Sequence, residues 1–288
     1  MTRNAENLRG MVAMLFAVAM FSVMDTTMKL LAAHYPAIQV AALRSLVALP
    51  LVVAWVAWRG ALRSVLRVNW PIHLLRAALG IAMLSLFAFG LKSLSLAAAY
   101  TILFIGPILI TALSVVMLKE RVSPQRWMAV AAGMAGVLVV LRPDGSGFLT
   151  IGSLAILATA VCYAISAITA CMLARTERTE HMMFWLMILM AIGATALAAP
   201  GWVAIDPGHA PLLCALGISG FLGQMALNEA FARGEASSVA PFQYSALAWG
   251  MAIDWILWQT PPDRNTLLGA AIIIGSGVYL LRHEKVHA

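Results

Sequence analysis

Ten apolar segments, each close to the length of a membrane-crossing helix, follow one another along the chain with short connections between them. A helix needs about 20 apolar residues to cross a bilayer, where isolated segments can pair their backbone groups only as helices. Hydrophobic residues make up 62% of the chain and charged residues 11%, which leaves too little polar surface for a water-soluble protein of 288 residues. The sequence therefore predicts an all-α polytopic membrane protein with ten transmembrane helices, near residues 9–31, 38–58, 71–91, 96–118, 124–141, 151–173, 183–203, 211–232, 238–259 and 265–282.

The Lys and Arg residues are divided unequally between the two sides of the predicted bundle. With the N-terminus inside, thirteen lie on the cytoplasmic side, three on the opposite side and three within spans. Cytoplasmic loops carry such an excess. We therefore expect both termini to lie in the cytoplasm. The protein is then a multi-pass protein of the inner (plasma) membrane of a bacterial-type cell. This distribution also explains the net charge of +7 without a nucleic-acid partner.

The two halves of the chain resemble each other at an offset of about 140 residues. Leu141-Arg142 recurs as Leu281-Arg282, and Gly10 and Phe21 recur as Gly152 and Tyr163. Because each half holds five predicted spans, an odd number, the second half must be inverted relative to the first. We divide the chain into repeats over 1–143 and 144–288. Inverted repeats are typical of secondary transporters with a midplane substrate site, although duplication without transport is the alternative.

One set of motifs resembles the EamA domain of the drug/metabolite transporter superfamily. The set comprises an alanine-rich helix entry, a mid-helix proline, a short glutamate turn and a glycine-rich last helix, at Gly90 to Tyr100, Pro107, Leu118-Lys119-Glu120-Arg121 and Gly133 to Gly136. Arg44 matches the arginine usual in the second helix of that domain. The second half departs from the pattern, because Trp258-Gln259-Thr260 stands where the glutamate turn is expected. The length and ten-span layout are similar to YddG-type aromatic amino-acid exporters, and the resemblance implies export.

Charged side chains inside the predicted spans form a second group of candidate residues. Each costs roughly 2.5–3.5 kcal/mol on insertion scales. Four of them reach a similar depth in the outer third of the membrane, where we expect a gate or a substrate-headgroup site: Asp25, Lys29, Arg44 and Asp254. A paired cluster that merely packs helices is the alternative. Arg76 is close enough to the inner interface to extend into the headgroups, so we assign it no function.

A small, polar and aromatic set of residues near the predicted midplane is expected to line a substrate cavity. Pro107 lies at the centre of the fourth span, where it should kink the helix and free a backbone acceptor. The alternative is that these aromatic stripes face lipid or pack in the core. The expected cavity residues are Phe21, Ser22, Tyr100, Phe104, Pro107, Tyr163, Ser166, Gln224, Asn228 and Tyr244.

The sequence predicts no cofactor, metal or catalytic residue. Gly217-Ile218-Ser219-Gly220 matches the GxSG of rhomboid proteases, but the histidines lie in loops, tails or at a span end, away from Ser219. We interpret these glycines as a close-packing surface and the three cysteines as packing residues. Small residues four apart, at Ala129 and Gly133 and at Ala271 and Gly275, predict either internal packing or a homodimer through the fifth and tenth helices.

These observations favour a secondary transporter that exports small amphipathic metabolites, most readily amino acids with aromatic or bulky apolar side chains, by alternating access. Its partners are the small-molecule substrate and the lipid bilayer. Three alternatives stay open: a non-transporting assembly or sensor component, an intramembrane enzyme, and a transporter of a nucleoside, sugar or drug-like cation. Uptake or efflux in proteoliposomes separates transport from the other two classes.

The predicted topology can be tested by labelling from one side of the membrane. In a background without the three native cysteines, single cysteines at Ser64 and Gly208 should react from opposite sides in intact cells. The loop at Gly208 should react with an impermeant maleimide added outside, whereas Ser64→Cys should react only after permeabilisation. Outside labelling of both positions would contradict the inverted arrangement.

Overall fold

The computed structural model describes residues 3–61, 64–66, 68–90, 96–141, 150–259 and 264–286, and every regular element among them is a helix. The prediction of an all-α protein is therefore confirmed. The α-helices are α1 (Arg3–Leu31), α2 (Ala37–Trp58), α3 (Trp70–Gly90), α4 (Leu96–Leu103), α5 (Gly106–Met117), α6 (Pro124–Leu141), α7 (Ile151–Ala174), α8 (Thr179–Ala198), α9 (Ala210–Arg233), α10 (Ala236–Val239), α11 (Ser245–Trp258) and α12 (Arg264–Val286). Three 3₁₀ turns complete the set, η1 (Ala199–Gly201), η2 (Pro207–His209) and η3 (Ala240–Tyr244).

Nine segments within the described ranges are helical, long and apolar enough to cross a membrane. The expected ninth span, residues 238–259, is not one of them, because it is divided among α10, η3 and α11. α11 alone has 14 residues, fewer than the roughly 20 that a crossing needs. The expected fourth span is also interrupted, between α4 and α5, directly before Pro107. Proline lacks an amide donor and suits the first turn of a helix, so a new helix begins there.

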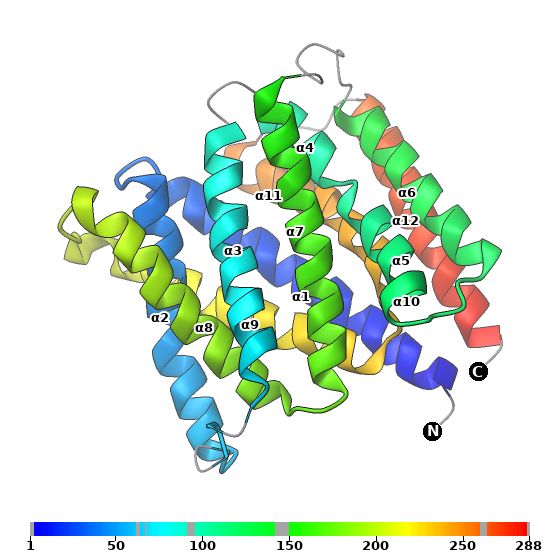
Figure 1. Ribbon diagram of the computed structural model, residues 1–288. Coiled ribbons are helices and arrows are strands. Elements are labelled where there is room, and N and C mark those ends of the chain that lie inside the picture. Colours follow the sequence, from blue (N-terminus) through cyan, green and yellow to red (C-terminus); the bar gives the residue numbers. More distant parts are fainter. Residues whose placement is uncertain are drawn as a thin grey trace.

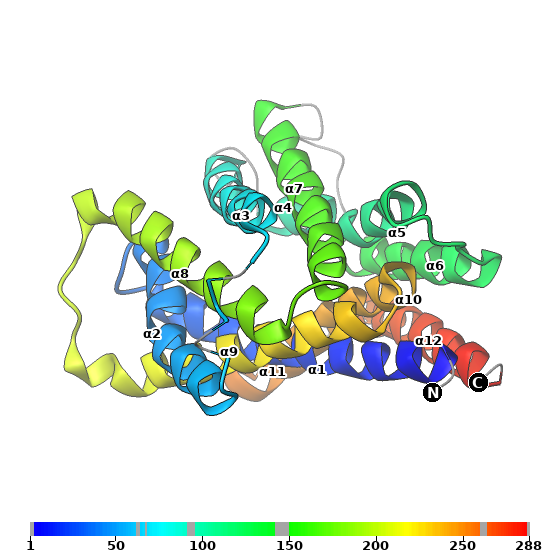
Figure 2. The ribbon, with the colours of Figure 1, turned by 60° about the horizontal axis from the view of Figure 1, so that its bottom comes forward.

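The helices pack as two related halves. α1 packs on α9, and α7 packs on α3, so the first span of each half contacts the third span of the other. α2 packs on α8, and α6 packs on α12, so the second and fifth spans contact their own counterparts. These last two pairs form opposite flanks of the molecule (Figure 1) and keep those places in the second view (Figure 2). A two-fold relation between the halves predicts this pattern of pairs.

The repeat also persists in the backbone. Lys119 and Gln259, 140 residues apart, have φ values of 55° and 52°, and they are the non-glycine residues with positive φ in the described part of the chain. Glycine contacts recur as well. A Cβ on Gly10 would lie 2.7 Å from the amide nitrogen of Gly234, and one on Gly90 would lie 3.0 Å from the carbonyl oxygen of Gly152. The boundary at 143/144 falls outside the described residues and stays a prediction.

The beginning of α1 and the end of α12 lie close together in both views, and we call this end of the molecule the terminal end (Figure 1). The opposite end, where α1 finishes, is the distal end. Two chain ends that lie together agree with both termini on one side of a membrane, as the sequence predicts. That this side is the cytoplasm stays a prediction.

The expected homodimer face is corrected for its fifth-helix half. Ala129 is buried, and a Cβ on Gly133 would lie 2.3 Å from Cδ2 of Tyr244, so both small residues serve contacts within the chain. Ala271 and Gly275 on α12 are exposed, and nothing lies within 4 Å of a Cβ built on Gly275. The α6–α12 contact is therefore an internal one.

The close approach of α6 and α12 makes Gly136 sensitive to added volume. A Cβ there would lie 2.7 Å from Cγ1 of Ile273 and 2.9 Å from the carbonyl oxygen of Gly269. Gly136→Ala should lower the free energy of unfolding by about 1–3 kcal/mol, because overpacking forces the helices apart. Gly275→Ala is the matched control and should leave the thermal midpoint in detergent unchanged or slightly raised. Equal midpoints for the two variants would contradict the tight α6–α12 contact.

Candidate functional site

The two interrupted spans meet through an aromatic pair. The ring of Phe104, at the end of α4, lies 6.1 Å from the ring of Tyr244, at the end of η3. These residues are 140 apart, the offset that relates Lys119 and Gln259, so each is the repeat counterpart of the other. A residue that contacts its own counterpart lies close to the axis relating the two halves. The pair therefore lies near the axis that relates the two halves, where it packs with residues of α6 and α12.

Tyr244 is fully buried, and its hydroxyl finds no hydrogen-bond partner among the described residues. Gly133 on α6 makes room for its ring. Burying a hydroxyl without a partner costs free energy. An unsatisfied polar group thus lies beside the aromatic pair, near the axis that relates the halves.

Tyr163 on α7 packs against the break in the fourth span. A Cβ on Gly106 would lie 3.3 Å from Cδ1 of Tyr163, so the glycine before Pro107 allows the ring to approach the backbone. Pro107 is buried, and its carbonyl oxygen accepts the Thr111 hydroxyl at 2.8 Å. Ser166 is half-buried on the same helix as Tyr163. The structure therefore brings Tyr163 to the position where the sequence predicts a freed backbone acceptor.

A second group of predicted residues lies toward the distal end. The guanidinium carbon of Arg44 lies 5.9 Å from the centre of the Phe21 ring, within range of a cation–π contact. Asp25, one turn along α1 from Phe21, interacts electrostatically with Arg44 and with Tyr100. Tyr100 is 39% exposed and packs on Phe87, with 6.2 Å between ring centres. An acid, a guanidinium and aromatic rings are thus gathered at one place.

The four residues of the predicted charge layer differ in what the structure shows of them. Asp25 and Lys29 are both exposed on α1, although the helix spans the bundle. The side chain of Asp254 lies outside the described part of the chain. Among the four expected residues, the structure shows an interaction between Asp25 and Arg44.

Polar residues on α9 form a buried pair. Nε2 of Gln224 donates to Oδ1 of Asn228 at 3.2 Å, and Nδ2 of Asn228 has no partner among the described atoms. The neighbouring Gly223 faces Phe21, because a Cβ there would lie 2.8 Å from the Phe21 ring. The hydroxyl of Ser22 donates within its own helix, to the carbonyl oxygen of Val18 at 2.9 Å. Ser22 thus satisfies its hydroxyl locally, whereas Asn228 retains an unused donor.

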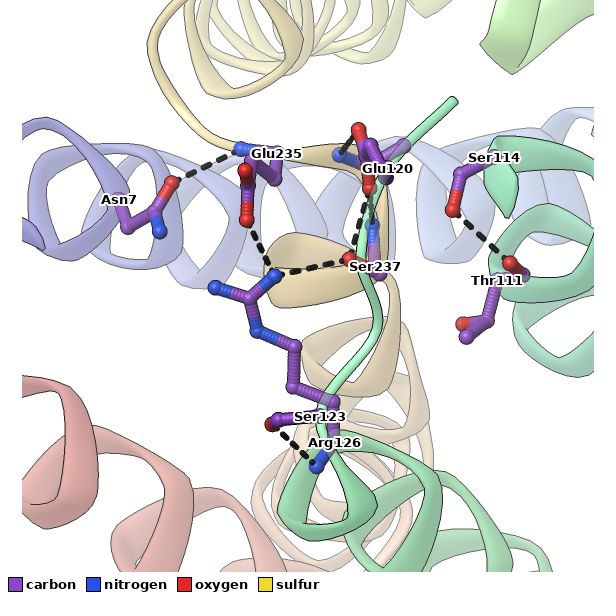
Figure 3. Close-up of polar contacts among 9 residues, drawn as sticks. Asn7, Thr111, Ser114, Glu120, Ser123, Arg126, Glu235 and Ser237 are labelled. Carbon is purple, nitrogen blue, oxygen red and sulfur yellow. Dashed lines mark hydrogen bonds and ion pairs between the residues drawn. The ribbon is translucent and has the colours of Figure 1, made fainter. Parts of the chain in front are cut away.

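The terminal end holds a network that sequence reasoning did not single out (Figure 3). Glu120, in the turn between α5 and α6, accepts the backbone N–H of Ala236 at 2.8 Å and that of Ser237 at 3.1 Å. It also accepts the Ser237 hydroxyl at 2.7 Å. The first amides of a helix have no partner within that helix. The glutamate of the first half therefore caps the interrupted ninth span of the second half.

Two further residues, Arg126 and Asn7, reinforce this cap, as Figure 3 shows. Arg126, at the start of α6, forms an ion pair with Glu235 and donates to the Ser237 hydroxyl at 3.1 Å. Asn7 on α1 accepts the backbone N–H of Glu235 at 3.0 Å. We call Glu120, Arg126, Glu235, Ser237 and Asn7 the terminal latch. The glutamate turn and the serine pair at the start of the ninth span were the available signals, but their pairing depends on tertiary contact.

A pocket of about 210 Å³ adjoins the terminal latch. Its lining includes three exposed cations, Lys119, Arg175 and Arg233, of which Arg233 pairs with Glu6 and Glu229, and the buried Cys171. Arg76 on α3 interacts electrostatically with Cys171. It is 3% exposed, so the expectation that it extends into the headgroups is wrong. Packing of α3 against α7 covers its side chain instead.

Other sequence features have structural roles in the described residues. The hydroxyl of Ser219 donates to the carbonyl oxygen of Ala215 at 2.6 Å, and Gly217 packs closely on Val47. This supports packing as the role of the GxSG motif. No group of three His, Cys, Asp or Glu side chains in the described ranges could hold a metal ion.

Comparison with known proteins assigns this arrangement to a family and a fold. The profile described as EamA-like transporter family matches residues 8–142 and 150–282, one match in each half. A riboflavin transporter of Rhizobium johnstonii is 28% identical over 226 residues, which cover 77% of this chain and 74% of the relative. An S-adenosylmethionine uptake transporter of Rickettsia prowazekii is 25% identical, with 96% of this chain and 94% of the relative covered.

Two further matches extend over almost the whole chain. The pseudopaline exporter CntI of Pseudomonas aeruginosa is 24% identical and covers 96% of this chain and 97% of its own length. A crystal structure superposes with a TM-score of 0.81 and 21% identity, covering 98% of this chain and 99% of the other. This likeness shows that the folds agree.

The capping role of Glu120 generates a prediction about local opening. Glu120→Ala removes the acceptor of three hydrogen bonds, and bonds to a charged group contribute about 1.5–3 kcal/mol each at most. Amide hydrogen exchange over residues 236–244 should therefore accelerate by at least about tenfold, which corresponds to about 1.4 kcal/mol. Glu229→Ala, which removes the exposed ion pair with Arg233, is the control and should leave this segment unchanged. Unaltered exchange in Glu120→Ala would show that the cap does not hold α10.

Proposed function

The chain belongs to the EamA-like transporter family, and from this premise we propose that it exports aromatic or bulky apolar amino acids by alternating access. It is a membrane transporter, a multi-pass protein of the bacterial inner membrane. The substrate class, the direction and the residues below belong to the proposal. In this proposal the chain performs no covalent chemistry.

The observation that carries the proposal is the placement of Asp25 and Arg44 beside aromatic rings. A zwitterionic amino acid presents a carboxylate and an ammonium group separated by one carbon atom. Arg44 can take the carboxylate through its planar fork of donors, and Asp25 can take the ammonium. Phe21 and Tyr100 supply ring faces beside these charges. An aromatic side chain would then extend toward Phe104, Tyr163 and Tyr244 at the centre of the bundle.

The names of the relatives support substrates of this chemical kind. S-adenosylmethionine joins an amino-acid group to an adenine ring, and riboflavin carries a flat aromatic ring system. A site with one charge of each sign and several aromatic faces suits such molecules. Among these relatives one name specifies uptake and another specifies export. The outward direction rests on the resemblance of the layout to aromatic amino-acid exporters.

The two ends of the bundle support alternating access. Asp25 and Tyr100 are exposed on the surface of segments able to cross a membrane, whereas the terminal latch ties α1, the α5–α6 turn, α6 and α10 together. In this arrangement the site faces the distal side. Loading from the terminal side requires release of the Glu120 and Arg126 contacts. The interrupted ninth span is short at this point, so its first turn can move without bending a long helix.

Substitution of Tyr163 tests the aromatic site. Tyr163→Ala should raise the apparent KM for phenylalanine and tryptophan by about fivefold or more, since an aromatic contact is worth about 1–3 kcal/mol. Tyr163→Phe keeps the ring and should have a smaller effect. Counterflow in proteoliposomes, normalised to folded protein, measures both. Tyr279→Ala is the matched control, because Tyr279 on α12 is 46% exposed and far along the chain from the site.

The outcomes separate the proposal from its alternatives. Wild-type kinetics in Tyr163→Ala would remove this residue from the site. Counterflow of a nucleoside or sugar, with none of phenylalanine or tryptophan, would replace the substrate class while keeping transport. No counterflow of any of these solutes by folded protein would favour an assembly or sensor component.

A further inference from the structure

Arg76 is a buried cation without a matching anion. It lies in the second turn of α3 and is 3% exposed. Its Nε and Nη1 atoms find no hydrogen-bond partner among the described residues. A guanidinium keeps its proton under all ordinary conditions, so it cannot reduce this cost by becoming neutral. Burying an unpaired charge is strongly unfavourable, which points to a partner that this arrangement lacks.

The nearest carboxylate is already engaged. Glu177, in the connection between α7 and α8, interacts electrostatically with Arg76. Its Oε1 accepts the backbone N–H of Asn69 at 2.5 Å, and its Oε2 lies 2.8 Å from Nε2 of His73. Both oxygens therefore hold the start of α3 in place. Arg76 is left with two donors directed at no acceptor.

The terminal-end pocket and Arg76 share a neighbouring element, α7. Cys171 on α7 lines the pocket and interacts electrostatically with Arg76, and α3, which carries Arg76, packs on α7. Lys119 and Arg175 line the same pocket, are exposed and form no ion pair among the described residues. The two pocket carboxylates are occupied, Glu120 by the cap of α10 and Glu235 by Arg126. The free charges at the pocket are therefore positive, which attracts anions toward it.

We propose that Arg76 is a carboxylate-binding residue for substrate on the terminal side. This role of Arg76 rests on the proposed function, in which an amino acid enters at the terminal end and leaves at the distal end. Release of the terminal latch would enlarge the pocket past Cys171 and let the carboxylate reach the guanidinium. Arg76 would then receive the same group that Arg44 holds toward the distal end. Each side of the bundle thus has its own guanidinium for the carboxylate.

The test uses a probe that carries only the carboxylate and the ring. Binding of 3-phenylpropionate to the full-length protein in detergent is measured by calorimetry, with 2-phenylethylamine as the probe without a carboxylate. Arg76→Met should weaken 3-phenylpropionate binding by at least tenfold and leave 2-phenylethylamine unchanged. Arg76→Lys keeps the charge without the planar fork and should be intermediate. Arg59→Gln, which removes an exposed guanidinium that pairs with Glu180, is the control.

Two further measurements make the result specific to this site. Because Arg44 offers a second guanidinium, alkylation of Cys171 is followed in a variant with Cys162→Ala and Cys214→Ala. The probe should slow alkylation when Arg76 is present and have no effect in Arg76→Met. The free protein should also gain thermal stability in Arg76→Met, because the substitution removes an unpaired buried charge. A purely structural arginine would instead lose stability on replacement.

The outcomes distinguish this inference from the proposed function. If phenylalanine is not transported but Arg76-dependent protection of Cys171 is found, the carboxylate site stands and the assigned substrate is wrong. The inference is overturned if wild-type protein does not bind 3-phenylpropionate, or if Arg76→Met binds it and protects Cys171 as well as wild type does.

Discussion

In the hydrocarbon core of a membrane, a backbone amide or carbonyl that leaves its helix must find another partner, because no water replaces it. The ninth span leaves its helical path at α10 and η3, so its first amides need an acceptor. Glu120 supplies it, from the other half of the chain. The Glu120 carboxylate accepts the Ser237 hydroxyl, and Arg126 at the start of α6 donates to the same hydroxyl. The glutamate turn, the interrupted span and α6 are thereby connected. The arrangement of the terminal end depends on it.

The pseudosymmetry of the bundle does not extend to this cap. Gln259 has the left-handed backbone of Lys119, so the turn itself is repeated. The residue after Lys119 is Glu120, whereas the residue after Gln259 is Thr260, which cannot supply a carboxylate. The halves therefore share a backbone plan and differ in the chemistry that fixes it.

Much of the fold could be predicted from the sequence because it follows from periodic, local properties. Apolar segments of spanning length predicted the helices, and the recurrence of Leu141-Arg142 predicted the offset that relates Phe104 to Tyr244. Pro107 correctly marked an interruption. The break before α11 was not predicted, because residues 238–259 are apolar enough on average to resemble one span, and the proline signal at Pro241, which lies in η3, was not used. The same limit applies to Arg76, whose burial depends on the packing of α3 against α7.

The candidate site was predictable in its residue types and not in its pairs. Asp25 and Arg44 were both expected in one layer, yet the sequence could not indicate that Arg44 would also lie over the Phe21 ring. Glu120 was recognised as part of the glutamate-turn motif, but the sequence assigned it no capping role, because its partners are more than a hundred residues away. Gln224 and Asn228 share a helix face, so their hydrogen bond follows from spacing alone.

The one-sided latch has a consequence for how the protein divides its time between conformations. If only molecules with the latch released can load substrate from the terminal side, the apparent affinity there is the intrinsic affinity multiplied by the released fraction. Each 1.4 kcal/mol contributed by the Glu120 contacts then raises the concentration needed for half-saturation by about tenfold. A carrier biased in this way transports little at low solute concentrations, and its transport rate rises in proportion as the solute accumulates. It therefore removes mainly the excess solute.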